Sequence, residues 1–356
     1  MRRILLLGLV LFVLCTAACF AAEKNLLACV MIGAKWGFID QAGKLIIPPR
    51  FGGAGGFSTG LAPVEINGRF GFINPVGRVV VKPRYDFATS FSDGLAAVKL
   101  GEKWGFIDRT GRQVIKSRYT YAGAPPFSGT LPIAVRIGDK WGFSDGLAAV
   151  LIQDKWGYID RKGGVVIKPR FDSVLSFSEG LAGVPLDGKW GFISKNGSSV
   201  IEPQFDDVMS FSGGLAPVRI AERWGYINRT GTVVIPAQFD ECRMFSEGLA
   251  AVKLAGKWGY IDKQGTSLIA ARFDWSADFS EGLAVVGVNG RRGCVDRKGA
   301  LVIPAKYDEM GDFSQGLAAV KVGGKWGYLD RAGKVIIPVR FNDAGPFQLT
   351  GSGPTK

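Results

Sequence analysis

The segment Gly188-Lys189-Trp190-Gly191-Phe192-Ile193 recurs along the chain and decides how the rest is interpreted. Its Trp position returns at intervals of 34 residues over most of the length, at Trp36, Phe70, Trp104, Trp156, Trp190, Trp224, Trp258, Arg292 and Trp326. A fixed period of this size is typical of repeat architectures, in which each unit shares its core with its neighbours.

Each copy predicts three short strands. The first two are Leu181–Leu186 and the segment around Trp190, separated by an Asp-Gly pair that favours a tight hairpin. An Asp-x-x-Gly sequence, as in Asp160 to Gly163, then favours a type I turn. A β-branched strand follows, and we expect Pro169 and its equivalents to end it because Pro cannot donate to a ladder. The Gly after each Trp is expected to make room for another backbone or ring.

The predicted fold is therefore all-β, built from tandem repeats of about 34 residues. Each repeat would be a three-stranded antiparallel meander, and the repeats would stack as an open solenoid-like array. A closed β-propeller is the alternative, although propeller blades usually have four strands. We expect each Trp to pack between adjacent copies, where its large apolar area is shared.

Residues 1–22 have the layout of a secretory signal peptide: two Arg residues, an apolar run from Ile4 to Leu14, then small residues. Cleavage after Ala21 or Ala22 is expected. The alternative is a lipid on Cys19, which would give peripheral membrane association. No later stretch is long and apolar enough to span a membrane.

The repeat array is predicted over residues 23–347, with nine near-complete copies and one truncated copy near 138–150, and residues 348–356 form a polar tail. The truncated copy places Gly146 only five residues after Trp141, so we expect a kink, bulged loop or break between Tyr119 and Lys155.

The chain contains no His, which excludes His-based catalysis and His-based zinc sites. Cys29, Cys242 and Cys294 lack metal-ligand spacing, and a Cys242–Cys294 bridge stays open. Carboxylates recur at a turn position (Asp108, Asp160, Asp262, Asp296, Asp330) and after Pro-x-aromatic (Asp86, Asp172, Asp206, Asp240, Asp274, Asp308). They could act as paired glycosidase carboxylates or calcium ligands. We favour turn capping, because an active site needs one special copy. No catalytic, cofactor or metal residue is predicted.

The formal net charge is +13, and basic residues also recur by position. One set precedes Trp (Lys103, Lys155, Lys189, Arg223, Lys257, Lys325) and another follows Ile-Asp (Arg109, Arg161, Arg229, Arg297, Arg331). These stripes could hold an anionic polymer. We favour the alternative, in which they lie over Trp faces and pair with the Asp positions. The Gly52–Gly56 run lacks the context of a phosphate loop and is interpreted as loop.

The Lys-Trp-Gly-Phe/Tyr-Ile-Asp and Phe-Ser-x-Gly-Leu-Ala motifs resemble those of the bacterial WG-repeat (KWG-repeat) family over Leu26 to Phe347. The resemblance implies an all-β repeat protein, often exported, and carries over no catalytic residues. The expected function is that of a secreted or periplasmic scaffold, without catalysis, that binds a protein or a cell-envelope polymer. The alternatives are a basic module that binds anionic polysaccharide or lipid, and a carbohydrate-processing enzyme that uses Asp carboxylates. The export signal argues against nucleic acid as a partner.

Overall fold

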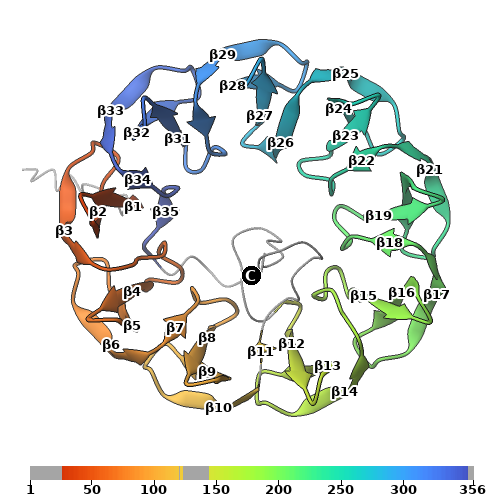
Figure 1. The fold of residues 1–356 in the computed structure, drawn as a ribbon, viewed down its shortest axis with the longest axis horizontal. Coiled ribbons are helices and arrows are strands. Elements are labelled where there is room, and N and C mark those ends of the chain that lie inside the picture. Colours follow the sequence, from red (N-terminus) through yellow and green to blue (C-terminus); the bar gives the residue numbers. More distant parts are fainter. Residues whose placement is uncertain (1–25, 120, 123–143, 352–356) are drawn as a thin grey trace, which may run out of the picture.

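The computed structural model describes residues 26–119, 121–122 and 144–351, and within these ranges the chain forms strands but no helix. The strands make up nine antiparallel sheets that stand side by side around a ring (Figure 1). The chain is therefore a nine-bladed β-propeller in the part that the structure describes. We number the blades 1 to 9 in chain order.

Each blade places one strand at the rim of the ring and the others successively closer to the centre (Figure 1). The outermost strands are β3 Leu45–Phe51, β6 Val79–Tyr85, β10 Gln113–Tyr119, β14 Val165–Phe171, β17 Ser199–Phe205, β21 Val233–Phe239, β25 Ser267–Phe273, β29 Leu301–Tyr307 and β33 Val335–Phe341. The next strands inward contain the Trp positions: β2 Lys35–Ile39, β5 Arg69–Ile73, β9 Lys103–Asp108, β13 Lys155–Asp160, β16 Lys189–Ser194, β20 Arg223–Asn228, β24 Lys257–Ile261, β28 Arg291–Asp296 and β32 Lys325–Asp330.

Two further layers complete the blades toward the centre. The first comprises β1 Leu26–Ile32, β4 Ala62–Ile66, β8 Leu95–Leu100, β12 Leu147–Ile152, β15 Leu181–Leu186, β19 Leu215–Ile220, β23 Ala250–Leu254, β27 Leu283–Val288 and β31 Leu317–Val322. The innermost strands are β7 Phe87–Ala88, β11 Tyr121–Ala122, β18 Asp207–Val208, β22 Glu241–Cys242, β26 Trp275–Ser280, β30 Glu309–Met310 and β34 Asp343–Ala344, with β35 Gln348–Leu349 beside β34.

The innermost strand corrects the predicted three-stranded unit. It is formed by the segment that follows Pro-x-aromatic-Asp. The sequence of this segment varies between copies, and the strand that it forms is mostly only two residues long. Such a segment has no apolar alternation, so its pairing depends on the neighbouring strand. Blades 2 and 5 have three strands. Their inner segments form no strand, although they contact the neighbouring strand through the bridge Ala54↔Val64 in blade 2 and the bond from Leu175 N to Gly183 O in blade 5.

The ring closes, so the open solenoid-like array predicted from the sequence is wrong. Strand β34 pairs with β1 through Val30↔Ala344, and β35 pairs with β1 through Leu26↔Leu349. Blade 1 therefore contains strands from both ends of the array. An open stack would leave the faces of its two end sheets uncovered, whereas closure covers both with the contacts used elsewhere in the ring.

Two side chains repeat the regular inter-blade contacts across this seam. Arg340 donates to the Gly43 carbonyl at 2.8 Å, as Arg170 donates to the Gly197 carbonyl at 3.0 Å. Asn342 accepts from the hairpin N–H of Gly33 at 3.1 Å, in the place where other blades carry Asp. The seam is thus chemically equivalent to an ordinary blade boundary.

The hydrophobic core consists of separate clusters, most of which lie between two adjacent blades. One joins Tyr226 of blade 6 to Phe245 of blade 7, whose ring centroids lie 5.0 Å apart, and equivalent aromatic pairs recur around the ring. Trp156 and Trp258 are buried in such clusters, while Trp224 and most other Trp residues are half-buried at the margin. The residue after Trp-Gly, rather than Trp, occupies the centre of these contacts, and it is aromatic except in blade 8, where it is Cys294.

The Gly after Trp is required by close approach of the outermost strand. A Cβ on Gly191 would lie 2.4 Å from the carbonyl oxygen of Ile201 and 2.7 Å from the nitrogen of Pro203. The register shifts there, so Pro203 stands in an irregularity of an edge strand and needs no N–H. The expectation that Pro ends this strand is wrong, since β14 continues through Pro169 and β21 through Pro236.

The irregular copy does not interrupt the ring. Strand β11 pairs with β12 through Tyr121↔Leu151, the same register as Asp207↔Arg219 in blade 6. Of the truncated copy predicted near 138–150, residues 147–150 belong to β12, and residues 123–143 lie outside the described part. The predicted signal peptide with Cys19 and the end of the tail also lie outside it, while Gln348 and Leu349, assigned to the tail, form β35.

Candidate functional site

A pocket of about 490 Å³ lies where the inner parts of blades 1, 2 and 3 meet, and we call it the seam pocket. Blade 1 contributes residues from both ends of the array, so ring closure is needed to form it. Its lining comprises Trp36, Gly53, Ala54, Gly55, Pro63, Phe70, Phe87, Ala88, Thr89, Ser90, Pro346 and Gln348. This volume falls in the range of small-molecule sites.

The Gly52–Gly56 run explains why the pocket is open. In blades 7 and 9 the position of Gly53 carries Glu241 and Glu309, which pair with Lys253 at 2.7 Å and with Lys321 at 2.6 Å. Blade 2 has no side chain there. The inner segment of blade 2 packs closely against β4, because a Cβ on Gly55 would lie only 2.8 Å from Cγ of Pro63. Blade 2 therefore lacks the side chains that fill the equivalent space in blades 7 and 9.

Three aromatic rings form the walls of the seam pocket. Phe70 occupies a Trp position of the repeat and Phe87 the position of Glu241. Their centroids are 5.4 Å apart, and Phe87 also lies 5.9 Å from Trp104. Phe87 is 44% exposed, which is unusual for a large apolar side chain inside a ring. Trp36, half-buried, supplies the third ring.

The polar groups of the seam pocket are few and uncharged. The hydroxyl of Thr89 is engaged, since it accepts from Ala97 N at 3.1 Å. Ser90 Oγ makes a long contact of 3.4 Å to the Gly56 carbonyl. Gln348 Oε1 is buried without a hydrogen-bond partner, and its amide packs so close to Gly56 that a Cβ there would overlap it. A buried acceptor without a partner is costly and marks a place where a ligand donor would fit.

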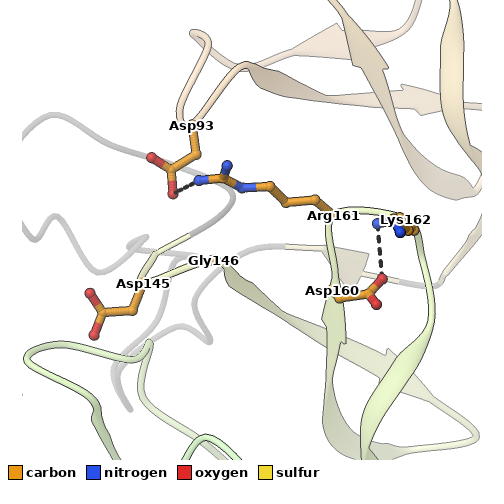
Figure 2. A pocket seen from close by; sticks show the side chains of 6 residues that line it. All are labelled: Asp93, Asp145, Gly146, Asp160, Arg161 and Lys162. Atoms are coloured by element: carbon orange, nitrogen blue, oxygen red, sulfur yellow. Dashed lines mark hydrogen bonds and ion pairs between the residues drawn. The ribbon is translucent and has the colours of Figure 1, made fainter. Parts of the chain in front are cut away.

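A second pocket, of about 620 Å³, lies between the hairpins of blades 3 and 4 (Figure 2). Its charged groups already have structural partners. Arg161 pairs with Asp93 at 3.0 Å, Asp160 caps its own turn, and Asp145 accepts from Gly180 N at 2.7 Å. We therefore assign no site to it.

The Asp residues of the turn position act as predicted. Asp160 Oδ1 accepts from Lys162 N at 2.9 Å and from Gly164 N at 2.8 Å. The same pair of bonds occurs at Asp108, Asp262, Asp296 and Asp330. Turn capping is confirmed for this set.

The Asp residues after Pro-x-aromatic have a different role from the predicted one. Asp206 binds Lys189 Nζ of blade 5 at 2.5 Å and accepts from Ala221 N of blade 6 at 2.9 Å. The Lys189 hydrogen bond holds the pKa of the Asp206 carboxyl below its usual range. Both kinds of contact recur at Asp86, Asp240, Asp274 and Asp308, and Asp172 binds Lys155. These carboxylates join blades rather than cap turns.

Four of the eleven predicted basic positions belong to the same network. Lys155, Lys189, Arg223 and Lys257 pair with these Asp residues, while Lys103 and Lys325 are exposed at the starts of β9 and β32. Of the second set, Arg161 and Arg297 contact Asp93 and Glu247, and Arg109, Arg229 and Arg331 are exposed at their turns.

The cysteines of the described residues form no disulfide. Cys29, Cys242 and Cys294 are buried and free, so the Cys242–Cys294 bridge does not form. In the same part of the chain no group of three or more Asp, Glu or Cys is arranged to hold a metal ion. A search there for helices that could cross a membrane finds none.

The sequence matches the profile of a family described as "WG containing repeat" in nine stretches. They are residues 36–70, 70–104, 104–141, 156–190, 190–223, 224–258, 258–291, 293–326 and 326–348. The chain belongs to the WG-repeat family. No curated protein matches the sequence of this WG-repeat protein.

Solved structures share the ring. One described as the crystal structure of the eukaryotic initiation factor has a TM-score of 0.64 at 11% identity, covering 93% of this WG-repeat chain and 100% of that chain. Dihydro-heme d1 dehydrogenase NirN in complex with DHE has a TM-score of 0.45 at 13% identity, covering 93% of this chain and 76% of that chain. Hsv2p of Kluyveromyces lactis has a TM-score of 0.41 at 11% identity, covering 73% of this chain and 98% of that chain. The first supports the fold, and none informs function.

Sequence analysis missed the seam pocket of this WG-repeat protein. The signals were present as departures from the repeat: the Gly52–Gly56 run, and Phe70 and Phe87 at positions held elsewhere by Trp and by an acidic residue. The sequence could not assign these departures to one site, because Gln348 and Trp36 belong to opposite ends of the array and meet only through ring closure.

Proposed function

We propose that this WG-repeat protein is an exported binding scaffold without catalytic activity, and that a protein or cell-envelope polymer docks in the seam pocket. One observation carries the proposal: the pocket is lined by three aromatic rings and uncharged groups at the place where the repeat loses its filling side chains. Concave, mostly apolar pockets with a few polar groups are the usual places for ligands.

The repeated charged residues support this assignment over the two alternatives. A carbohydrate-processing enzyme that used the repeated carboxylates would need one of them free of structural contacts, yet Asp206 and Asp274 are both used between blades. Binding of an anionic polymer along the set that precedes Trp would need a continuous free basic stripe, yet Lys189, Arg223 and Lys257 in the middle of that set are paired.

The test is binding to an envelope extract by purified full-length protein and two variants. Phe87→Ala removes one pocket wall, and Glu241→Ala changes the equivalent position in blade 7 as a matched control. We expect Phe87→Ala to reduce the bound fraction at least about tenfold, since losing one aromatic anchor costs roughly 2 kcal/mol. Equal binding by wild type and Phe87→Ala, with both proteins folded, would overturn the proposal.

A further inference from the structure

We infer that the seam pocket binds a neutral sugar unit of a polysaccharide, an inference that rests on the proposed function of this pocket. Three features of the pocket lining restrict the chemical class of the ligand.

The first feature is the absence of charge in the lining. The chain carries a net charge of +13, yet none of the residues that line the seam pocket is charged. Blades 7 and 9 place an acid–base pair at the equivalent position, through Glu241 and Glu309. No lining residue offers a positive charge, and the carboxylate of Glu65 beside Gly53 repels anions, so an anionic ligand group would be poorly held here. A neutral ligand avoids this cost.

The second feature is the set of ring surfaces. Trp36, Phe70 and Phe87 offer aromatic faces, and Pro63 and Pro346 add rigid apolar surface. The 44% exposure of Phe87 leaves ring surface for a ligand to cover. A sugar ring matches such walls, because its axial C–H groups form an apolar face while its hydroxyls remain at the edge.

The third feature is the hydrogen-bonding group at the pocket margin. Gln348 Oε1 lacks a partner and needs a donor, and Ser90 Oγ is held only by a 3.4 Å contact. Sugar hydroxyls and acetamido N–H groups are donors. A proline-rich peptide, the other ligand that aromatic grooves commonly take, lacks N–H groups at each Pro. The lining thus favours the sugar.

The experiment is calorimetric titration of the full-length protein with three probes: cellohexaose, chitohexaose and a proline-rich decapeptide. We expect one of the hexasaccharides to bind and the peptide not to bind. Phe87→Ala and Gln348→Ala should weaken the sugar at least about tenfold, as expected for loss of an aromatic wall or of a buried hydrogen bond. Glu241→Ala, the matched control, should leave the affinity unchanged.

Indole fluorescence gives an independent readout. Sugar bound against Trp36 should shift the emission of the wild type, and this shift should vanish in Trp36→Phe. Binding of the peptide but not of either sugar would overturn the inference and leave the proposed function standing. If pocket variants also bind the envelope extract like the wild type, the proposed function fails as well. Sugar binding that is insensitive to Phe87→Ala and Gln348→Ala would overturn the inference alone.

Discussion

Blades 2 and 8 both depart from the repeat at the Trp position, with opposite results. In blade 8 the guanidinium of Arg292 lies 4.1 Å from the ring centroid of Trp275, above Gly287, which has no side chain. In blade 7 the ring stands at the Trp position and the cation on the next strand inward, with Lys253 over Trp258 at 5.9 Å. The changes in blade 8 compensate one another and preserve a cation–π contact.

Blade 2 has no such compensation. Phe70 replaces Trp and Gly53 replaces the acidic residue, but no larger side chain enters the space, and the seam pocket results. Where neighbouring side chains fill the space left by a substitution in the repeat, the substitution has a structural role. Where the space stays open, it marks a candidate binding site. The contrast between the seam pocket and blade 8 can be tested in four ways.

The largest effect should come from the core aromatic pair that blade 2 retains and blade 8 lacks. Phe72 is fully buried, 4.9 Å from Phe91, whereas blade 8 has Cys294 there, with its sulfur 3.6 Å from that of Met310. We expect Phe72→Ala to lower the free energy of unfolding by about 3–5 kcal/mol and Cys294→Ala by about 1 kcal/mol. Urea unfolding measures both. Equal losses would show that the Cys294–Met310 contact contributes as much as the aromatic pair and would contradict this prediction.

A smaller effect should test whether blade 8 is compensated. Trp275→Ala and Arg292→Ala each remove one side of the cation–π contact, so the double variant should lose less than the sum. We expect a coupling free energy of about 1 kcal/mol in a double-mutant cycle followed by urea unfolding. Additive losses would mean that the two substitutions in blade 8 are independent.

Refilling the seam pocket should change binding with little change in stability. Gly53→Lys would face Glu65, whose carboxylate lies 3.2 Å from the expected Cβ, and would project into the pocket. We expect the free energy of unfolding to stay within about 0.5 kcal/mol, as for exposed ion pairs. Envelope binding should fall at least about tenfold, the loss expected for Phe87→Ala. Retained binding in the folded variant would place the ligand elsewhere.

At neutral pH the smallest effect concerns the thiols of the two regions, which influence stability only at alkaline pH. Burial raises the pKa of Cys29, beside the seam, from 9.0 to about 11 and that of Cys294 to about 12. The folded chain therefore keeps thiol protons that the unfolded chain loses above pH 9. Stability should be unaffected by these groups below pH 9 and should fall as the pH rises from 9 toward 12.

Native alkylation can separate the same two thiols. At pH 10, Cys29 should hold more thiolate than Cys294, because burial raises the pKa of Cys294 further. Mass spectrometry of maleimide adducts, with Cys29→Ser as control, measures the order of reaction. Faster labelling of Cys294 would contradict it.

The sequence predicted the elements that depend on local chemistry. The strands around Trp190, the tight turn at Asp187-Gly188 and the capping by Asp160 follow from strand propensity, positive φ and side-chain hydrogen bonding within a few residues. The sequence did not predict strand β34 or the contacts of Asp206, because both depend on a neighbouring blade.

The repeat period by itself determined an all-β array whose units share their cores, because each copy carries the same short strands and turns. Only the tertiary structure decided that the array closes, since closure depends on the small rotation between blades summed around nine sheets. The seam pocket belongs to this second kind of information. Trp36 and Gln348 stand at opposite ends of the array, and no local pattern brings them together.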